Sequence, residues 1–567
     1  MDLPIHPFRE GLVDAVGRFQ ALLVVGETGS GKTTQLPQFI HSAGLHADGD
    51  RRLKIGVTQP RRVAAVSVAT RVAEEMRCSL GGLVGYRIRF DDRTSADTQI
   101  QYMTDGVLLR ECIDDPLLSA YKVIVLDEAH ERSLETDILF GFLKLVLSKR
   151  SDLKLVVMSA TLDVKQFSAY FDNCPIFEIP GRTFDVDIFY NEYACFTHLH
   201  ACFIIFLLTY VCLRDMDVAH YATQFTTSAL STVLHIHEKD SPGDILVFLT
   251  GSAEIEDFCR RLERAHASLD YRLVEHRDVR DMLVLPLYGA LEADLQRAIF
   301  DRPPRGTRKV VVCTNIAATS VTIDGIRYVV DAGLVKQKEY DAKTGMDALA
   351  VTRISKAAAE QRAGRAGRTA HGKCYRLFSR AFFESMPDAT VPEIQRTSLA
   401  ATVLVLKQVG VDDVLAFQFM ERPDTEMLVS ALKQLFLLGA LDARGAITDV
   451  GHAMIQFPLA PQLARALIAG AHEGCGKDMA TLAAMLSVED VFVKPRGGRA
   501  QEADKAREGF SDQVRILNKG IMIWYHFVVF LCMYLSFYLF CSTRSLLEMT
   551  IFGHFPVNFP FTVTLSF

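Results

Sequence analysis

The sequence has 567 residues, of which 49% are hydrophobic and 23% are charged, so it can bury several cores and should form several domains. Its formal net charge of −6 excludes a general polycation, and binding of nucleic acid would need a local basic groove. The cysteines include no C-x-x-C pair, which disfavours a zinc site. The start MDLPIHPFREG lacks a secretory pattern, and isolated cysteines suit a reducing nucleus or cytoplasm.

Short apolar runs alternate with amphipathic stretches up to about Pro387 and predict two parallel α/β sheets in tandem. The strands expected in the first sheet are Ala21–Val25, Lys54–Thr58, Lys122–Leu126 and Leu153–Met158. Those expected in the second sheet are Asp244–Thr250, Met282–Tyr288, Lys309–Thr314 and Arg327–Ala332. Beyond these runs helical periodicity prevails, as in Thr425–Leu441, and indicates helical accessory domains.

The segment GETGSGKT (Gly26–Thr33) follows an expected strand and precedes a helical stretch, as a phosphate-binding loop does. In such a loop glycines allow backbone N–H groups to surround phosphates. Lys32 is expected to pair with the β- and γ-phosphates, and the Thr33 hydroxyl to bind Mg²⁺. A chance glycine-rich turn is the alternative. The candidate nucleotide-binding residues of the loop are Gly26, Glu27, Thr28, Gly29, Ser30, Gly31, Lys32, Thr33 and Thr34.

The sequence DEAH (Asp127–His130) also follows an expected strand, where a second acidic motif of a nucleotide-hydrolysing enzyme should lie. Asp127 would hold Mg²⁺, directly or through water, and Glu128 would take the proton from the attacking water. A helix N-terminus with acidic residues in its first turn is the alternative interpretation.

The segment QRAGRAGR (Gln361–Arg368) contributes a third part of the candidate site. Arg365 and Arg368 are three residues apart, so on one helix they would share a face and could reach the same phosphate. Phosphoryl transfer needs cations where negative charge develops, and Gln361 could orient the attacking water. A solvated basic helix is the alternative.

Together the motifs resemble the DEAH-box branch of the superfamily-two helicases, in sequence order and over roughly Leu3–Asp512. The resemblance implies two RecA-like domains with ATP and Mg²⁺ in the cleft between them, followed by winged-helix and partial ratchet domains. The further motifs that carry it are Thr58–Ala65, Thr104–Arg110, Ser159–Thr161, Leu246–Gly251, Thr314–Ile323 and Val391–Thr397.

The resemblance also implies roles for residues that match the family's motifs. Ser159 and Thr161 look like the link between ATP site and domain movement, and His130 is similar to the residue that contacts Gln361 across the closed cleft. The further nucleotide contacts that it implies are Arg71 and Phe300 on either side of the adenine and Asp324 at the ribose.

Residues just after strands or in loops are candidates to hold an RNA backbone without reading its sequence. Arg87 and Phe90 look like the family's hook-shaped turn against the RNA, and Gly333–Thr352 resembles its wedge-like β-hairpin. An ordinary surface contact remains the alternative for each single residue. The other RNA-contact candidates are Arg61, Arg62, Thr104, Thr250, Thr314 and Asn315.

The resemblance divides the chain into six parts. They are the first RecA-like domain (1–185), a linker with an apolar insert (186–220), the second RecA-like domain (221–387), a winged-helix domain (388–449), a partial ratchet domain (450–513) and a hydrophobic tail (514–567).

The chain departs from the family pattern at three places. Ala318 stands where the commonest form of its motif has glutamate, and the resemblance stops near Gln513, so the family's OB-fold is not expected. Tyr193–Leu213 and Gly520–Thr543 carry no charge and by length alone could span a bilayer. A span at the first would separate the two ATPase domains. The tail could span without such a separation. Because both segments interrupt or replace the family pattern at sharp points and differ in composition from the rest, retained intron sequence or a gene-model error is the preferred interpretation of the insert and the tail.

The spacing of the motifs predicts an ATPase. The resemblance implies an ATP-dependent RNA helicase that moves 3′→5′ on single-stranded RNA and unwinds or remodels ribonucleoproteins, for example in pre-mRNA splicing or ribosome biogenesis. The alternatives are a catalytically impaired RNA-binding scaffold and a membrane-tethered NTPase. A soluble monomer in the nucleus or cytoplasm is expected. A membrane is not an expected partner. An activating protein is a candidate partner, although the OB-fold on which such proteins commonly dock in the family is not expected here.

Overall fold

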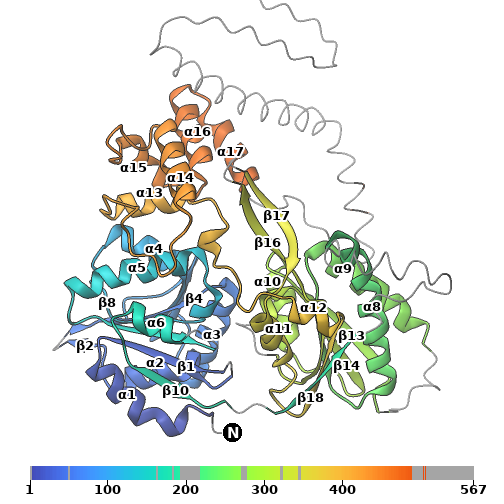
Figure 1. Ribbon diagram of the computed structural model, residues 1–567. Helices are drawn as coiled ribbons and strands as arrows, with labels where there is room; N and C mark the ends of the chain where they lie inside the picture. Colours follow the sequence, from blue (N-terminus) through green and yellow to red (C-terminus); the bar gives the residue numbers. More distant parts are fainter. Residues whose placement is uncertain are drawn as a thin grey trace, which may run out of the picture. The chain divides into compact units, whose positions relative to one another are not determined.

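A computed structural model of the chain describes residues 3–27, 29–48, 51–160, 164–181, 184–191, 218–269, 278–318, 323–341 and 346–487, with positions 502 and 505 (Figure 1). The chain forms two compact units, Met1–Phe436 with Ala440–Ile455, and Leu437–Gly439 with Gln456–Phe567. The apolar segment Tyr193–Leu213 and the hydrophobic tail 514–567 lie outside the described residues. Among the described helices, none has the length and apolar composition needed to cross a bilayer.

The first α/β domain is built on an eight-stranded sheet, and the four strands expected from the sequence are confirmed. All its neighbouring strands run parallel except the last pair, β5–β6. The central strands are buried along nearly their whole length, which explains their uninterrupted apolar sequences. In spatial order the strands are β10 (Ile176–Ile179), β1 (Ala21–Gly26), β9 (Lys154–Ser159), β8 (Tyr121–Leu126), β4 (Lys54–Gln59), β7 (Ile100–Thr104), β5 (Val84–Ile88) and β6 (Asp91–Arg93).

Helices connect these strands and pack their apolar faces on the sheet (Figure 1). A short pair of strands, β2 (Ala47–Asp48) and β3 (Arg51–Arg52), lies outside the sheet. The helical segments are η1 (His6–Phe8), α1 (Arg9–Arg18), α2 (Lys32–Ser42), α3 (Arg62–Glu75), α4 (Asp105–Asp114), η2 (Ala129–Glu131), α5 (Leu134–Lys149) and α6 (Val164–Tyr170).

The second α/β domain has a six-stranded, fully parallel sheet, and its four expected strands are also confirmed. Its edge strand β11 occupies the first residues of the stretch that the sequence-based division assigned to the linker 186–220, so the second sheet begins within that stretch. A short alternating segment at a domain boundary carries little signal of the sheet it joins. The spatial order is β11 (Val186–Tyr190), β18 (Gly372–Arg376), β15 (Ile326–Asp331), β12 (Asp244–Phe248), β14 (Thr307–Cys313) and β13 (Asp281–Leu287).

An antiparallel hairpin follows β15, as expected from the sequence: β16 (Leu334–Asp341) pairs with β17 (Met346–Arg353). Gly333, at φ +71°, begins the hairpin against Phe378, whose ring leaves no space for a Cβ there. The remaining helical segments of this domain are α8 (Val218–Lys239), α9 (Ser252–Ala267), α10 (Ala293–Arg297), η3 (Ala298–Phe300), η4 (Asn315–Ala317), α11 (Lys356–Ala363) and α12 (Arg380–Glu384).

The helical region after Pro387 agrees with the expected change of periodicity. The helix expected over Thr425–Leu441 is present as α14 (Thr425–Leu437), and it ends just before Gly439, whose φ of +73° suits a helix terminus. In the second unit α16 (Pro461–His472) packs on α17 (Gly476–Leu486), where Gly470 allows close contact with Met479. The other helical segments of the region are η5 (Glu393–Gln395), α13 (Ala400–Gln408) and α15 (Asp449–Ile455).

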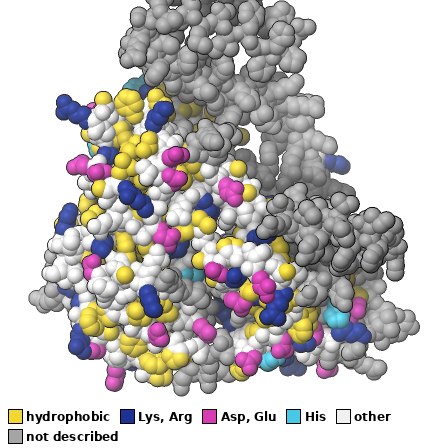
Figure 2. All heavy atoms as spheres, in the orientation of Figure 1, with side chains coloured by type: hydrophobic (Ala, Val, Ile, Leu, Met, Phe, Trp, Pro, Cys, Tyr) yellow, Lys and Arg dark blue, Asp and Glu magenta, His cyan; other side chains and the backbone are white. Residues whose placement is uncertain are grey.

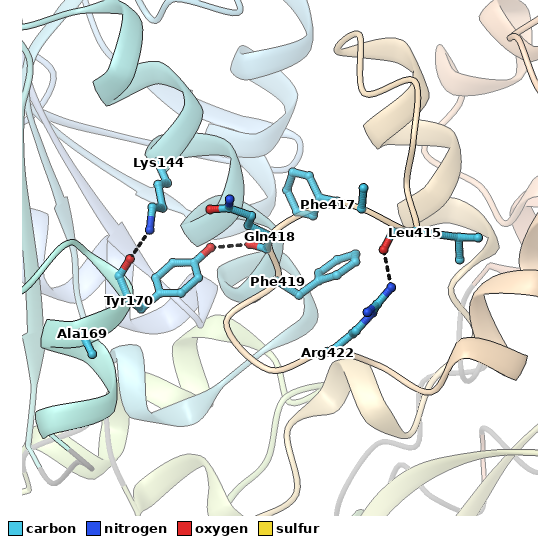
Figure 3. A pocket seen from close by; sticks show the side chains of 9 residues that line it. Lys144, Ala169, Tyr170, Leu415, Phe417, Gln418, Phe419 and Arg422 are labelled. Atoms are coloured by element: carbon cyan, nitrogen blue, oxygen red, sulfur yellow. Dashed lines mark hydrogen bonds between the residues drawn. The ribbon is translucent and has the colours of Figure 1, made fainter.

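A pocket of about 460 Å³ lies where the loop before α14 meets helices α5 and α6 of the first domain (Figure 3). The Tyr170 hydroxyl donates to the carbonyl of Gln418 at 2.5 Å, and the ring of Phe417 fills the space that a Cβ on Gly141 would need. Nearby, Arg132 donates to Glu421 at 2.7 Å. The loop 415–422 therefore packs on the first domain although it follows the second domain in the chain.

The ion pair between Arg362 and Asp331 is almost fully buried in the second domain, with side-chain exposures of 1% and 0%. Arg362 Nη1 donates to Asp331 Oδ1 at 2.7 Å, and Nη2 donates to the carbonyl of Leu334 at 3.1 Å. The guanidinium also lies over the ring of Phe248 at 4.8 Å.

Asp331→Ala is expected to destabilise the second domain by about 3–5 kcal/mol, because Arg362 keeps its buried charge without a counterion. The melting transition of that domain should fall by roughly 6–20 °C in a thermal scan. Asp388→Asn is the matched control, because it removes the ion pair of an exposed carboxylate with Lys356 and should cost less than about 1 kcal/mol. Equal shifts in the two variants would contradict a structural role for the buried pair.

Candidate active site

The phosphate-binding loop connects β1 to α2 at the carboxyl edge of the first sheet. Gly29 and Gly31 have φ of +91° and +95°, a backbone region that favours glycine. A Cβ on Gly31 would also lie 3.0 Å from both Leu3 and Ile5. The turn therefore favours glycine at positions 29 and 31, while Thr28 lies outside the described residues.

Lys32 begins α2, and its buried amine points back into the loop. Nζ donates to the carbonyls of Gly26 and Glu27, the latter at 2.9 Å, and contacts Ser30 Oγ at 3.3 Å. Burial lowers the pKa of Lys32, and the nearby carboxylates Glu128 and Asp127 oppose this shift. The cation is thus held at the loop, where phosphate oxygens would be strong acceptors.

Asp127 lies directly after β8 and faces the start of α2. Its Oδ2 accepts a hydrogen bond from the Thr33 hydroxyl at 2.6 Å, and its Oδ1 accepts one from the backbone N–H of Glu128 at 2.9 Å. Burial and then the charge of Glu128 raise the pKa of Asp127 to about 6. A carboxylate and a hydroxyl together beside a phosphate loop are hard oxygen donors, and they fit Mg²⁺.

Glu128 has a left-handed backbone with φ +52°, and its side chain caps no helix. Glu128 thus precedes the one-turn helix η2, and Glu131 is an acidic residue in that turn, but the Glu128 side chain makes no capping hydrogen bond. Burial, followed by the charge of Glu131, raises the pKa of Glu128, which brings this carboxylate closer to the range of an effective general base. A strained backbone at a non-glycine residue typically costs about 1–3 kcal/mol and is common at functional sites.

His130 contacts a residue of the second domain, Gln361, at the distance of a hydrogen bond, 2.7 Å between their Nε2 atoms. Burial lowers the pKa of His130 to about 4, so the ring is neutral at pH 7. With the Gln361 amide as donor, Nε2 of the ring accepts and Nδ1 carries the proton, 3.4 Å from the Ser159 hydroxyl. The structure thus brings together three of the expected residues, while Thr161 lies outside the described part.

Arg365 and Arg368 do not lie on one helix, contrary to the expectation, because α11 ends at Ala363. Tight turns follow, with backbone bonds from Arg365 to Arg362 and from Ala366 to Ala363. Such i→i−3 turns bring residues three apart onto one side, so both arginines still line one small cavity beside Ala317 and Ile323.

Both arginines are held in surroundings that disfavour their charge. Burial, then the charge of Arg368, lowers the pKa of Arg365, whose guanidinium also donates to the carbonyl of Ala318. Burial lowers the pKa of Arg368 to about 10, opposed by Glu128 and Asp324. Since Arg365 is only 3% exposed, a solvated basic helix is the wrong interpretation. Two partly desolvated cations make a strong site for an anion.

Arg71 lies on α3 and is tied to the helix after the phosphate loop through Glu75. Its Nε donates to Glu75 Oε1 at 2.8 Å, and Glu75 Oε2 accepts from Gln35 and Gln38 of α2 at 2.8 and 2.9 Å. Burial would raise the pKa of Glu75, but the hydrogen bonds from Gln38, Arg71 and Gln35 lower it overall. The sequence motifs missed Gln35 and Gln38, because no local spacing joins two helices, whereas the i,i+4 spacing on α3 could have indicated the pair of Arg71 and Glu75.

The other two expected nucleotide contacts lie in the second domain. Phe300 ends η3 with 39% of its surface exposed, and Asp324 lies in the turn before β15. The contacts found among the described residues do not join Arg71 to either of them. Their meeting around a nucleotide stays a prediction.

The expected RNA contacts lie at the carboxyl ends of strands in both sheets. Thr104 ends β7, and Thr250 and Thr314 follow β12 and β14. Arg61, after β4, donates to the carbonyl of Asn315 at 3.0 Å and pairs with Glu131 at 3.1 Å, so it joins two of the expected positions. Arg62 is the exposed first residue of α3.

Arg87 and Phe90 belong to the β5–β6 hairpin, which agrees with the expected turn. Phe90 is 87% exposed at the tip, with φ +70° and Arg89 over its ring at 4.9 Å. Arg87 is paired with Asp92 at 2.8 Å and Glu111 at 3.0 Å. On the face in Figure 2 basic and acidic side chains are interspersed, in keeping with the net charge of −6.

Comparisons with known proteins place the chain among helicases. Residues 9–169 match the DEAD/DEAH box helicase family, and 227–370 match the helicase conserved C-terminal domain. Residues 431–459 and 460–519 match the winged-helix and ratchet-like parts of the helicase associated domain. The chain is 48% identical over 522 residues to the pre-mRNA-splicing factor ATP-dependent RNA helicase prp22 of Schizosaccharomyces pombe. The match covers 91% of this chain but only 41% of that relative.

Glu75→Ala is expected to weaken ATP binding about fivefold, because it removes the carboxylate that orients Arg71; one charged hydrogen bond is worth roughly 1 kcal/mol when partly exposed. Equilibrium titration with a fluorescent ATP analogue measures the effect. Glu74→Ala is the control, because Glu74 is the exposed neighbour of Glu75 on the same helix. An unchanged dissociation constant in Glu75→Ala would remove Glu75 from this role.

Proposed function

Because the chain belongs to the DEAH-box family of helicases, we propose that it is an ATP-dependent RNA helicase, which hydrolyses ATP between two RecA-like domains and acts on single-stranded RNA. The observation that carries the proposal is the meeting of DEAH and QRAGRAGR at the bond between His130 and Gln361. An ATPase whose parts lie on two domains can convert hydrolysis into relative domain movement.

The phosphate site is proposed to divide its work between the two domains. Lys32 binds the β- and γ-phosphates, and Glu128 takes the proton of the attacking water, which Gln361 orients. Arg365 and Arg368 stabilise the charge that develops on the transferred phosphoryl group. Every one of these side chains is present, which disfavours the inert scaffold.

Other residues are proposed to bind Mg²⁺ and the adenosine part of ATP. Thr33 and Asp127 would hold Mg²⁺, which supplies charge neutralisation at the phosphates when bound. Arg71 and Phe300 would stack on the adenine, and Asp324 would meet the ribose. The hydrogen-bonded position of Arg71 on Glu75 supports the first of these contacts.

RNA would lie across the carboxyl edges of both sheets. The candidate RNA contacts lie on both domains, and the hydrogen bond from Arg61 to the Asn315 carbonyl brings the two sets together. His130, Ser159 and Thr161 would couple the ATP site to domain movement. Alternate grip by the two domains would move the enzyme 3′→5′, with the β16–β17 hairpin as a wedge.

We further propose a nuclear role in pre-mRNA splicing, because the similar helicase of S. pombe is a pre-mRNA-splicing factor. The substrate would then be a ribonucleoprotein, since contacts to a backbone select no sequence and specificity must come from partners. A monomer that works with an activating protein is the simplest assembly.

Glu128→Gln is expected to lower RNA-stimulated ATP hydrolysis about 100-fold or more, because the amide cannot take the proton from water. Binding of ATP should stay within about twofold, since the amide has the size of the carboxylate and the phosphate loop is intact. Steady-state turnover with and without single-stranded RNA, and titration with a fluorescent analogue, measure both. Turnover near that of the unchanged protein would contradict the role of Glu128 as general base. If RNA did not stimulate ATP turnover of the unchanged protein, the proposal of an RNA helicase would be contradicted.

A further inference from the structure

Gln59 is a buried glutamine at the edge of the nucleotide site, and none of the roles described above uses it. It is the last residue of β4, which pairs in parallel with β8. The register Thr58↔Leu126 places the next residue of each strand, Gln59 and Asp127, side by side. Gln59 is 1% exposed, and its Nε2 donates to Asp127 Oδ2 at 2.5 Å.

The carboxylate of Asp127 has about four acceptor positions. Two are used on Oδ2, by Thr33 and Gln59, and one on Oδ1, by the backbone N–H of Glu128. Three donors from three different segments fix the plane of the carboxylate. The remaining acceptor position belongs to Oδ1, and it is the one left for a divalent cation or for a water bound to the cation.

A neutral donor has a specific advantage at this position. A lysine or arginine side chain would neutralise the Asp127 carboxylate and compete with a metal cation. A second acidic side chain would repel the Asp127 carboxylate. An apolar side chain would leave Oδ2 with one donor fewer in a buried place and would let the carboxylate turn. The amide of Gln59 orients Asp127 and leaves its negative charge available.

The same segment reaches the second domain. Two residues after Gln59, Arg61 donates to the Asn315 carbonyl and pairs with Glu131. The position of the carboxylate is therefore linked, through a short stretch of backbone, to a contact between the two α/β domains.

We propose that Gln59 is a positioning residue for the divalent cation, which holds Asp127 in the orientation that binds Mg²⁺ with the nucleotide. The proposal rests on the proposed function, because it concerns the Mg²⁺ that Thr33 and Asp127 would hold there. Partners of a metal ligand commonly contribute 10- to 100-fold to metal affinity.

The test is the gain in nucleotide affinity that Mg²⁺ provides, measured as the ratio of the dissociation constants of a fluorescent ADP analogue in EDTA and in Mg²⁺. Gln59→Leu is expected to lower this ratio by about 10-fold or more. Gln59→Met keeps roughly the size of the side chain without a donor or a charge, serves where the leucine variant folds poorly, and should lower the ratio as well. Affinity in EDTA should stay within about twofold of the unchanged protein.

Gln101→Leu is the matched control. Gln101 is equally buried on the neighbouring strand β7 but donates to the Tyr121 hydroxyl at 3.0 Å, away from Asp127. An unchanged ratio in Gln59→Met, or an equal fall in Gln101→Leu, would overturn the proposal. If the dissociation constants of the unchanged protein in EDTA and in Mg²⁺ were equal, that result would instead contradict the cation site itself. The assay needs no RNA, so failure of the helicase activity is a separate result.

Discussion

The hydrogen bond between His130 and Gln361 joins the two halves of the candidate active site. Lys32, Asp127 and Glu128 stand on the first α/β domain, while Arg365 and Arg368 stand on the second. Burial keeps the imidazole neutral, so it can accept the amide proton at Nε2 and hold its own proton at Nδ1. The neutral ring thereby contacts both Gln361 and the Ser159 hydroxyl without adding a charge to a site that already holds several charged side chains.

The site is built from buried charges that oppose one another. Burial raises the pKa of Asp127 and Glu128 and lowers that of Lys32 and Arg365, and in each case charges of opposite sign resist the shift. Each domain alone would hold part of this set without its counterpart. The charge balance therefore favours the arrangement in which both domains and a polyanion meet, which is the arrangement that the proposed hydrolysis requires.

The motifs that could be predicted from sequence are those whose geometry is local. A phosphate loop needs its glycines within a few residues, and Asp127 meets Thr33 because the carboxyl ends of nearby parallel strands share one edge of the sheet. The bonds of Gln59 to Asp127 and of Glu75 to Gln35 join distant segments, and no spacing indicates them. The sequence pattern also does not show where α11 ends. After that end Gly367 packs closely on the first residues before β11, and a Cβ added to Gly367 would lie 2.4 Å from the carbonyl oxygen of Phe184.

A double-mutant cycle on His130 and Gln361 tests the central claim most directly. RNA-stimulated ATP turnover would be measured for His130→Ala, Gln361→Ala and the double variant. If the two side chains act through one bond, the double variant loses little more than either single variant, with a coupling energy of roughly 0.5–3 kcal/mol. Losses that simply multiply would show that the two residues act independently and would contradict an active site joined through this contact.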